Sequence, residues 1–277
     1  MKRKSNLRHI VIYAILSLIS VLSISPFFLM IITSFKNMGD LTSGGPLALP
    51  VIWRWDNYIR IWGVGNFTLY FRNSILVSGA CVLCVVLFSL LGAYAFAYLD
   101  FKGKGFLFTL ILLGLMIPTE LIIIPLFFNL KAIKLNNTFW ALIFPLAALI
   151  LPFAIVLLRG FMRDIPSALR ESAQLDGCTE IQSLIHIIAP MVKPAIISVV
   201  IFTSIWSWNN FMLPTILIQS DDFRTLPLGL NYFTGKYTSN YTMISTAANI
   251  SAFPTILVFM ILQRKFIEGM MIGALKE

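Results

Sequence analysis

The most polar interior stretch of the chain, Arg159 to Lys193, reads RGFMRDIPSALRESAQLDGCTEIQSLIHIIAPMVK and lies between long uncharged apolar runs. Pro166 suits the first turn of a helix, because its missing N–H needs no partner there. Gly177 predicts the end of that helix, since Gly readily adopts the left-handed conformation that closes a helix. Thr179 predicts the cap of a second helix. The stretch therefore predicts two short helices separated by a turn.

Both predicted helices are amphipathic. On the first, a small apolar face is expected from Leu169, Ala173 and Leu175. On the second, apolar residues recur at i, i+3, i+4 and i+7 and so predict a single stripe formed by Ile181, Leu184, Ile185 and Ile188. The chain contains no soluble domain against which these apolar faces could pack. We therefore expect the helix pair to dock on another protein.

The composition is that of an integral membrane protein. Of 277 residues, 58% are hydrophobic and 12% are charged, whereas soluble domains contain about 25% charged residues. The net charge of +9 is expected from basic residues that flank membrane spans, and it does not require a nucleic-acid partner. Cys81 and Cys84 lie at helical spacing within an apolar run. We interpret them as buried small side chains, not as a metal or redox site.

The sequence contains six uncharged or nearly uncharged runs of about 20 residues. Each run is long enough for a helix to cross the hydrocarbon core. They predict one all-α transmembrane domain over residues 1–277, with spans at 10–32, 73–99, 106–130, 139–158, 195–219 and 244–262 and a polar loop at 159–193. Most of the 21 Lys and Arg residues fall on the side of the membrane that holds both termini and this loop. Basic residues concentrate on the cytoplasmic side, so we expect the termini and the loop in the cytoplasm.

Three short motifs in the polar loop resemble the EAA loop of bacterial ABC-importer permeases: Glu171-Ser172-Ala173, Asp176-Gly177 and Ile188-Ala189-Pro190. Ser172 and Ala189 depart mildly from the family pattern. The wider resemblance is to carbohydrate permeases of the maltose type, specifically the second permease subunit. It extends over nearly the whole chain, through Ser34–Asn37, Asn73-Ser74, Gly92–Ala97, Trp208/Asn209/Phe211, Thr225–Leu230 and Gln263–Lys276.

The resemblance implies a type I importer permease of six transmembrane helices in the bacterial plasma membrane. Its partners would be a homologous permease, two ATPase subunits, an extracytoplasmic solute-binding protein, a di- or oligosaccharide and membrane lipid. The implied ATPase-coupling residues are Glu171, Ala173, Asp176, Gly177, Ile188 and Pro190, and Gly273 and Lys276 of the tail would run toward the ATPases.

The chain itself carries no G-x-x-x-x-G-K-[ST] phosphate loop and no catalytic motif. We therefore predict that it is not an enzyme and binds no cofactor or metal, and that ATP and Mg are held by the partner subunits. Two alternatives stay open on the sequence alone. A secondary transporter would need paired intramembrane coupling residues, and a membrane scaffold would need no docking helices.

Four polar or aromatic residues within the spans are candidates for the translocation path. Glu120 is an acid inside a span, where a charge is costly, and it either lines the solute path or supports a helix broken at Pro118. Trp208, Asn209 and Asn210 have the side chains that stack on and hydrogen-bond to sugars. Interhelical packing is the alternative for these three, and it is favoured because the partner permease holds the sugar in maltose-type relatives.

Overall fold

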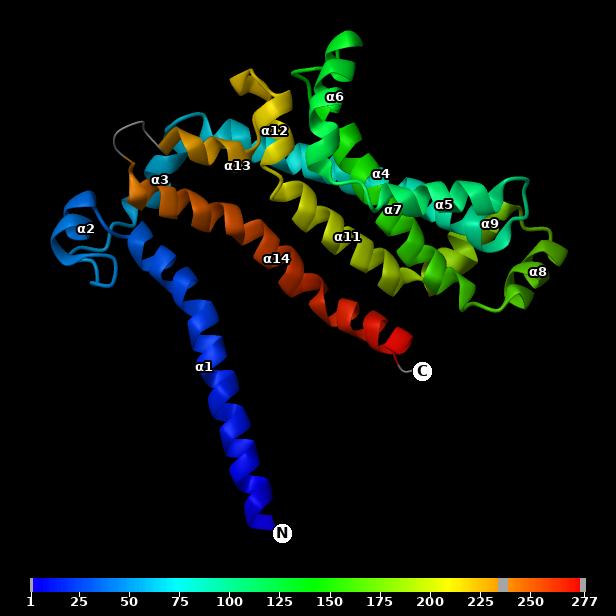
Figure 1. The fold of residues 1–277 in the computed structure, drawn as a ribbon, viewed down its shortest axis with the longest axis horizontal. Helices are drawn as coiled ribbons and strands as arrows, with labels where there is room; N and C mark the ends of the chain where they lie inside the picture. Colours follow the sequence, from blue (N-terminus) through cyan, green and yellow to red (C-terminus); the bar gives the residue numbers. More distant parts are fainter. Residues whose placement is uncertain (1, 234–238, 275–277) are drawn as a thin grey trace. The chain divides into compact units, whose positions relative to one another are not determined.

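A computed structural model of the chain describes the backbone of residues 2–233 and 239–274 and the side chains of residues 9–233 and 239–263. The described residues form helices joined by turns and loops (Figure 1). The chain divides into two compact units. Unit 1 comprises Met1–Phe67 and Gly229–Phe253, and unit 2 comprises Thr68–Leu228 and Pro254–Glu277. The sequence predicts a single domain; the structure distributes the spans over these two units.

Four helices within the described residues are long and apolar enough to cross a membrane: α1 (Lys2–Ser34), α4 (Phe67–Tyr98), α7 (Trp140–Arg163) and α14 (Tyr241–Ala274). The number is six if each of two sharply bent helix pairs counts as one span. One pair is α5 (Lys104–Gly114) with α6 (Thr119–Ala132), bent by 102°. The other joins Glu180–Met191 to α11 (Lys193–Trp208), bent by 82°. The fold class predicted from the sequence, an all-α integral membrane protein, is confirmed.

Two predicted spans are interrupted. The run 106–130 breaks between α5 and α6, because Pro118 has no N–H to donate and disfavours the helical conformation of the residue before it. Pro125, in contrast, lies within α6. The run 195–219 breaks after Trp208, and α12 (Met212–Leu217) follows. Asn209 there donates to the carbonyl of Ile205 (2.8 Å), and the side-chain oxygen of Asn210 accepts from the amide of Leu213 (3.1 Å).

Unit 1 is built around the end of α1. The ring of Phe35 contacts Trp53 (5.4 Å), Trp55 (4.5 Å) and Tyr58 (5.2 Å) from the loop that contains α2 (Met38–Gly44) and α3 (Asp56–Arg60). Asn57 donates from its amide to the carbonyls of Ser34 (2.8 Å) and Lys36 (3.1 Å). The aromatic loop therefore closes the last turn of α1, whose remaining carbonyls need partners.

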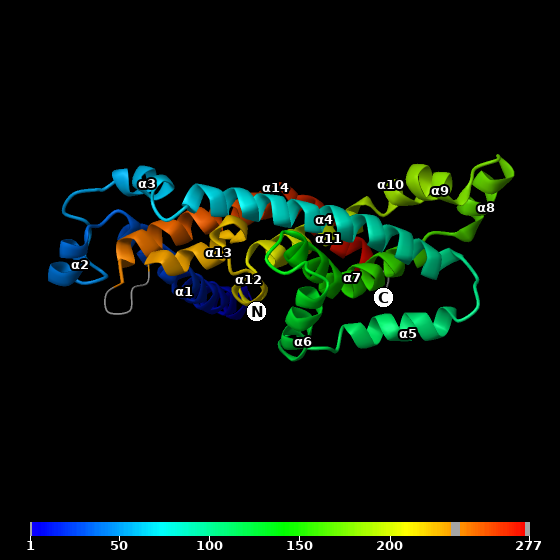
Figure 2. The same cartoon turned by 90° about the horizontal axis from the view of Figure 1, so that it is seen from above.

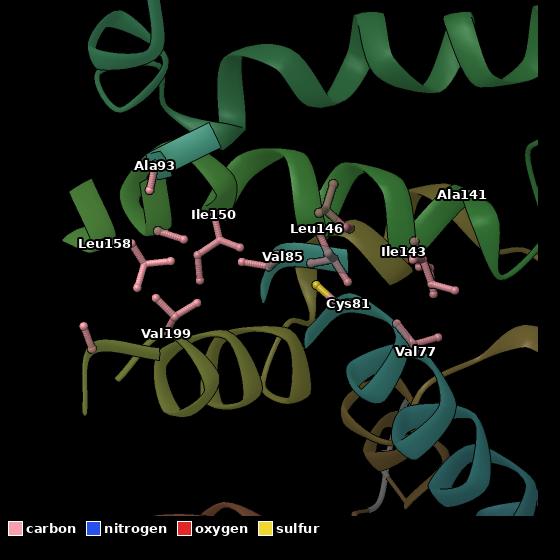
Figure 3. Packing of buried hydrophobic residues seen from close by; sticks show 14 of the residues in the cluster. Val77, Cys81, Val85, Ala93, Ala141, Ile143, Leu146, Ile150, Leu158 and Val199 are labelled. Carbon is pink, nitrogen blue, oxygen red and sulfur yellow. The ribbon is translucent and has the colours of Figure 1, made fainter. Parts of the chain in front are cut away.

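Unit 2 has its core where α4, α7 and α11 meet. Figure 3 shows side chains of α4 and α7 converging, joined by Val199 of α11; those of α4 are Val77, Cys81 and Val85, and those of α7 include Leu146, Ile150 and Leu158. Cys81 is fully buried, and both it and Cys84 are free thiols. The structure thus places Cys81 in the apolar core, as the sequence predicts.

Short helices occupy the two ends of α7. Beyond its carboxyl end lie α8 (Ser167–Leu175), α9 (Glu180–Ser183), a π-helical turn (Leu184–Ile188) and α10 (Ala189–Met191). At its amino end α12 packs against α6 and α7. Both views of the ribbon place α8 and α9 at one end of unit 2 and α6 and α12 away from it (Figures 1 and 2). The polar segment 159–193 is therefore spatially separated from the other end of this helix bundle.

Candidate coupling site

The turn between α8 and α9 is closed by Gly177. Its φ is +88°, in the left-handed region that side chains other than Gly rarely adopt. The amide of Gly177 donates to the carbonyl of Gln174 (3.0 Å), and the amide of Cys178 donates to that of Ala173 (2.9 Å). These two bonds form a Schellman motif, which satisfies the last carbonyls of α8. The predicted glycine stop is confirmed.

A capping box opens α9. The side chain of Thr179 accepts from the amide of Gln182 (3.3 Å), and the side chain of Gln182 accepts from the amide of Thr179 (2.8 Å). Two of the amides that a helix start leaves without partners are thereby satisfied. Thr179 is the cap that the sequence predicts, and the direction of α9 is fixed locally on both sides of Gly177.

The apolar stripe predicted on the second helix does not face one way. Leu184 and Ile188, four residues apart, are buried in the core of unit 2, whereas Ile181 (62% exposed) and Ile185 (56% exposed) form a separate outward face. The reason is that residues at i and i+4 share a face, so a run at i, i+3, i+4 and i+7 contains two such pairs on adjacent faces. The sequence cannot tell which pair packs inward.

The apolar face predicted on the first helix also separates. Ala173 is buried, Leu169 is 43% exposed and Leu175 is 89% exposed. Leu175 and the outward pair on the second helix, Ile181 and Ile185, thus leave apolar side chains uncovered on the segment that joins the spans. Large apolar side chains exposed together indicate a surface that another protein covers.

A cluster of hydrogen bonds around the Glu180 carboxylate ties both short helices to α4. Arg170 of α8 donates through Nε to Glu180 Oε2 (3.1 Å) and through Nη2 to Oε1, and Gln174 donates to Oε1 (2.7 Å). From α4, the hydroxyl of Tyr94 donates to Glu180 Oε2 and accepts from Arg170 Nε (3.2 Å). We call these four residues the Glu180 clamp. It couples the orientation of α8 and α9 to the end of a membrane-spanning helix.

The clamp is held mainly by charge. The hydrogen bonds from Arg170 hold the pKa of Glu180 below its ordinary value of 4.5, against the opposing effect of burial. Conversely, the bonds to Glu180 raise the pKa of the Arg170 guanidinium. The Arg170 side chain is only 16% exposed. Charge-assisted bonds of this two-point kind fix geometry more strongly than neutral ones.

The predicted coupling residues fall into three structural groups. Ala173 and Ile188 are buried and hold the segment against unit 2, Gly177 forms the turn, and the exposed residues are Glu171, Asp176 and Pro190. The segment therefore contains both an internal scaffold and a free outer face. In the tail, Gly273 lies in the last turns of α14, and Lys276 lies outside the described residues.

The candidate path residues are not brought together into one site. Trp208 is buried at the end of α11, where its ring meets Phe71 edge to face at 5.7 Å. Asn209 and Asn210 cap the break that follows it, so their amides serve the backbone. Glu120 is exposed in the first turn of α6, where the partial positive charge of a helix start favours an acid. It therefore lies just after the break at Pro118.

Sequence reasoning missed the Glu180 clamp. Tyr94 and Glu180 are 86 residues apart, and Arg170 and Glu180 lie on different helices. A usable signal was present, because a cation and an acid flank the Gly177 turn and Tyr94 places a hydroxyl at the same end of the membrane-spanning bundle. The pairing itself depends on how α4 and α8 meet, which no local pattern specifies.

The opposite end of unit 2 is held by neutral hydrogen bonds. Asn73, fully buried near the start of α4, donates to the carbonyls of Asp222 (2.8 Å) and Arg224 (2.9 Å). Ser74 Oγ accepts from the amide of Leu226 (2.7 Å). These bonds fix the loop at 220–228 to the membrane-spanning helices. We call this loop the outer loop; it contains the start of the Thr225–Leu230 match.

Comparison with known proteins identifies the class. The profile of the family described as binding-protein-dependent transport system inner membrane component matches residues 85–271. The chain belongs to this family. Membership gives no support to the alternatives of a secondary transporter or a scaffold.

Curated relatives cover most of the chain. The Probable ABC transporter permease protein YurM of Bacillus subtilis is 35% identical over 251 residues, which is 91% of this chain and 83% of the relative. The Arabinooligosaccharides transport system permease protein AraQ of Halalkalibacterium halodurans is 33% identical and covers 93% of both chains. The Diacetylchitobiose uptake system permease protein NgcG of Streptomyces coelicolor is 33% identical and covers 91% of this chain and 84% of the relative.

The fold is also that of a solved importer. A chain from the crystal structure of a bacterial ABC transporter involved in the import of the acidic polysaccharide alginate superposes with a TM-score of 0.83 at 21% identity, covering 95% of this chain and 98% of the other. A chain from the alginate transporter in complex with an alginate pentasaccharide-bound periplasmic protein gives a TM-score of 0.66 at 18% identity, with 94% of each chain covered. The helical arrangement is therefore that of an ABC-importer permease.

Proposed function

We propose that this chain is a permease subunit of an ATP-driven importer of di- or oligosaccharides. Relatives at 33% identity or a little below it are named for the transport of arabinooligosaccharides, diacetylchitobiose and starch degradation products. A solute-binding protein outside the membrane delivers the sugar, and this chain forms the path through the membrane together with a homologous permease. Two ATPase subunits, which hold ATP and Mg, supply the energy.

One observation carries the coupling role. The helices α8 and α9 and the π-helical turn after them expose Leu175, Ile181 and Ile185, and the Glu180 clamp fixes α8 and α9 to α4. If this surface only anchored the protein to a partner, the exposed side chains would be sufficient and the hydrogen-bonded link to α4 through the Glu180 clamp would not be needed. With both, a force applied to α8–α9 by an ATPase subunit passes through Glu180 and Tyr94 into a membrane-spanning helix. Closure of the ATPases on ATP then moves the spans and alternates access to the path.

The orientation follows from the same assignment. The segment 159–193 and both termini lie in the cytoplasm, where the ATPases are, and the outer loop lies on the other face, where the solute-binding protein docks. The excess of Lys and Arg beside the termini and the polar segment supports this topology. It corresponds to six membrane crossings, with each of the two bent helix pairs counted as one.

The test is reconstitution of the complete importer in proteoliposomes. Initial uptake of radiolabelled arabinotriose, diacetylchitobiose and maltotriose is measured with and without internal ATP and with and without the solute-binding protein. The proposal predicts uptake of at least one sugar that requires both, and no ATP hydrolysis by this chain purified alone. Uptake that continues without ATP, driven by an ion gradient, would overturn it.

A further inference from the structure

The segment of unit 1 at residues 47–59, which follows α1 and ends in α3, exposes large apolar side chains that the coupling role does not use. The exposed fraction is 75% for Leu47, 65% for Leu49, 82% for Val51 and 76% for Ile59. We call this segment the apolar loop. Large apolar side chains exposed together mark a surface that is covered in the functional protein.

Polar groups at the end of α1 hold the apolar loop in place. Lys36 is fully buried, and its Nζ donates to the carbonyls of Gly45 (3.1 Å) and Pro46 (3.0 Å), directly before the loop. Near the other end of the loop, the buried amide of Asn57 donates to the carbonyls of Ser34 and Lys36. The loop is therefore tied to α1 on both sides, and its apolar side chains are presented outward from a fixed frame.

The end of α1 sets the depth of this loop in the membrane. The run predicted to cross the hydrocarbon core ends at Ile32, and Phe35 follows about 4.5 Å farther along the helix axis. The headgroup layer on each side of the core is about 5–8 Å thick. The ring of Phe35 contacts the rings of Trp53 (5.4 Å) and Trp55 (4.5 Å) of the apolar loop. These tryptophans therefore lie at the level of the headgroups.

The composition of the apolar loop is that of a membrane interface. Between Asp40 and Asp56 the only charged residue is Arg54. Trp53 and Trp55 are exposed, and tryptophan concentrates at the boundary between membrane and water because its ring is apolar and carries one N–H donor. An arginine beside them can keep its charged end among the headgroups. A loop surrounded by water, or the polar rim of a protein interface, would carry more charge.

We propose that the apolar loop is embedded in the bilayer interface at the end of α1, with Leu49, Val51 and Ile59 in contact with phospholipid chains beneath the headgroups. Phospholipid is the occupant because the loop lies at headgroup depth and carries little charge. The loop also continues the exposed apolar surface of α1, which extends to Ile31. The loop then fixes the end of α1 in the membrane and is withdrawn from the solute-binding protein. The assignment to the outer leaflet rests on the proposed function, whereas the embedding does not.

The experiment measures the depth of a nitroxide label in the complete importer, reconstituted in nanodiscs of phosphatidylcholine and phosphatidylglycerol. The label is attached to a p-azidophenylalanine that replaces Val51 or Ile59, so the cysteines of the complex stay unmodified. The matched control is a label at Ser43, an exposed polar residue of α2. Collisions with oxygen, which concentrates in lipid, are compared with collisions with a nickel–EDDA complex, which stays in water. Spin-labelled phospholipids calibrate the depth.

Labels at Val51 and Ile59 should collide mainly with oxygen and lie about 5–10 Å into the boundary between headgroups and acyl chains. The label at Ser43 should collide mainly with the nickel complex. A second variant, Leu49→Asn with Val51→Asn, tests whether the apolar side chains hold the loop in the bilayer. Both side chains are exposed, so the contacts of Phe35 stay intact. This variant should move the label at Ile59 toward water by about 3 Å or more, whereas Ser43→Asn should not.

Three results would overturn the inference. Labels at Val51 and Ile59 that collide mainly with the nickel complex would place the loop in water. Few collisions with either reagent would mean that protein covers the loop: the homologous permease if they are few from the start, or the solute-binding protein if they become few on its addition. An unchanged depth of the Ile59 label in the double variant would mean that the apolar side chains do not hold the loop. The depth is measured without transport, so a failure of ATP-dependent uptake would contradict the proposed function alone.

Discussion

The two ends of unit 2 are held in place by different chemistry. At the end that contains α8 and α9, the Glu180 clamp joins a carboxylate, a guanidinium and a phenol. At the end that contains the outer loop, Asn73 and Ser74 bind backbone groups without any charge. The first end also leaves Leu175 89% exposed, whereas Leu226 of the outer loop is fully buried.

This difference separates two structural tasks. Neutral side chain–backbone bonds to a buried segment attach a loop firmly to its own helices. A charged clamp beneath an exposed apolar face holds a surface at a defined angle while leaving that surface free for a partner. Unit 2 therefore has one end where neutral hydrogen bonds tie a buried loop to the spans, and one end where a charged clamp lies beneath exposed apolar side chains.

The largest effect is expected from Gly177→Leu. The φ of +88° strains any residue with a Cβ by on the order of 1–2 kcal/mol, although the space around the position is open. The new side chain would change the angle between α8 and α9 and project from the docking surface. We expect uptake to be abolished and the ATPase to be lost on co-purification, while the protein still inserts into the membrane.

The matched control is Gly105→Leu, at a helical glycine with equally open surroundings and no positive φ. It should retain the ATPase and most of the uptake. Normal uptake by Gly177→Leu would exclude the coupling role of this turn.

A smaller but still large effect is expected from Glu180→Gln. The change removes the charge that Arg170 pairs with and weakens the link to Tyr94, but it leaves the Schellman turn and the Thr179 cap intact. ATP-dependent sugar uptake should fall about tenfold, whereas binding of the ATPase should be only partly reduced. The reason is that the change weakens the link from α8 and α9 to α4 more than it alters the surface on which the ATPase docks. Glu171→Ala, at an exposed position of the same segment, should lower uptake about twofold or less. Equal effects of the two variants would contradict the clamp.

At the opposite end, Asn73→Ala tests the other half of the comparison. It removes two hydrogen bonds from a fully buried amide and leaves the carbonyls of Asp222 and Arg224 without that donor. We expect faster hydrogen exchange confined to residues 219–228 and a reduced response to the solute-binding protein. Co-purification of the ATPase should be unchanged. Loss of the ATPase from Asn73→Ala would mean that the two ends do not act separately.

The smallest effect is a pH dependence of the clamp. Because the pKa of Glu180 is lowered in the folded protein, its stabilising contribution is fully present above the ordinary value of 4.5 and is lost as the pH falls through the lower folded value. A fluorescent probe on the half-buried Cys178 should therefore report constant surroundings between about pH 8 and pH 5.5 and a change only below about pH 4.5. Glu180→Gln should abolish the change. A transition centred near neutral pH would assign the response to another group.

Local chemistry made much of the coupling segment predictable. The glycine turn and the threonine cap depend on residues within one helical turn of each other, so sequence alone identifies both. The inward or outward direction of Ile181, Leu184, Ile185 and Ile188 depends on how the segment packs against α4 and α7, so it could not be predicted. The Glu180 clamp was missed for the same reason.

The spans show a similar division. Hydrophobic length predicted where α1, α4, α7 and α14 lie, and Pro118 indicated the break in the run 106–130, but the break at Asn209 was not predicted. An apolar run looks continuous even where amides or a proline end the helix, because hydropathy measures burial in lipid and not backbone geometry. Pro145 and Pro152 lie within α7, so proline alone does not mark a break.

The most direct test of the coupling role is site-specific photo-crosslinking in membranes that contain the complete importer. A benzophenone amino acid replaces Leu175, the most exposed apolar residue of α8, and in a second variant it replaces Gln219, an exposed residue next to the outer loop. Leu175 should crosslink to an ATPase subunit, with a yield that changes on ATP addition, and Gln219 should not. If Leu175 yields no ATPase adduct while Gln219 does, the segment 159–193 is not the docking site.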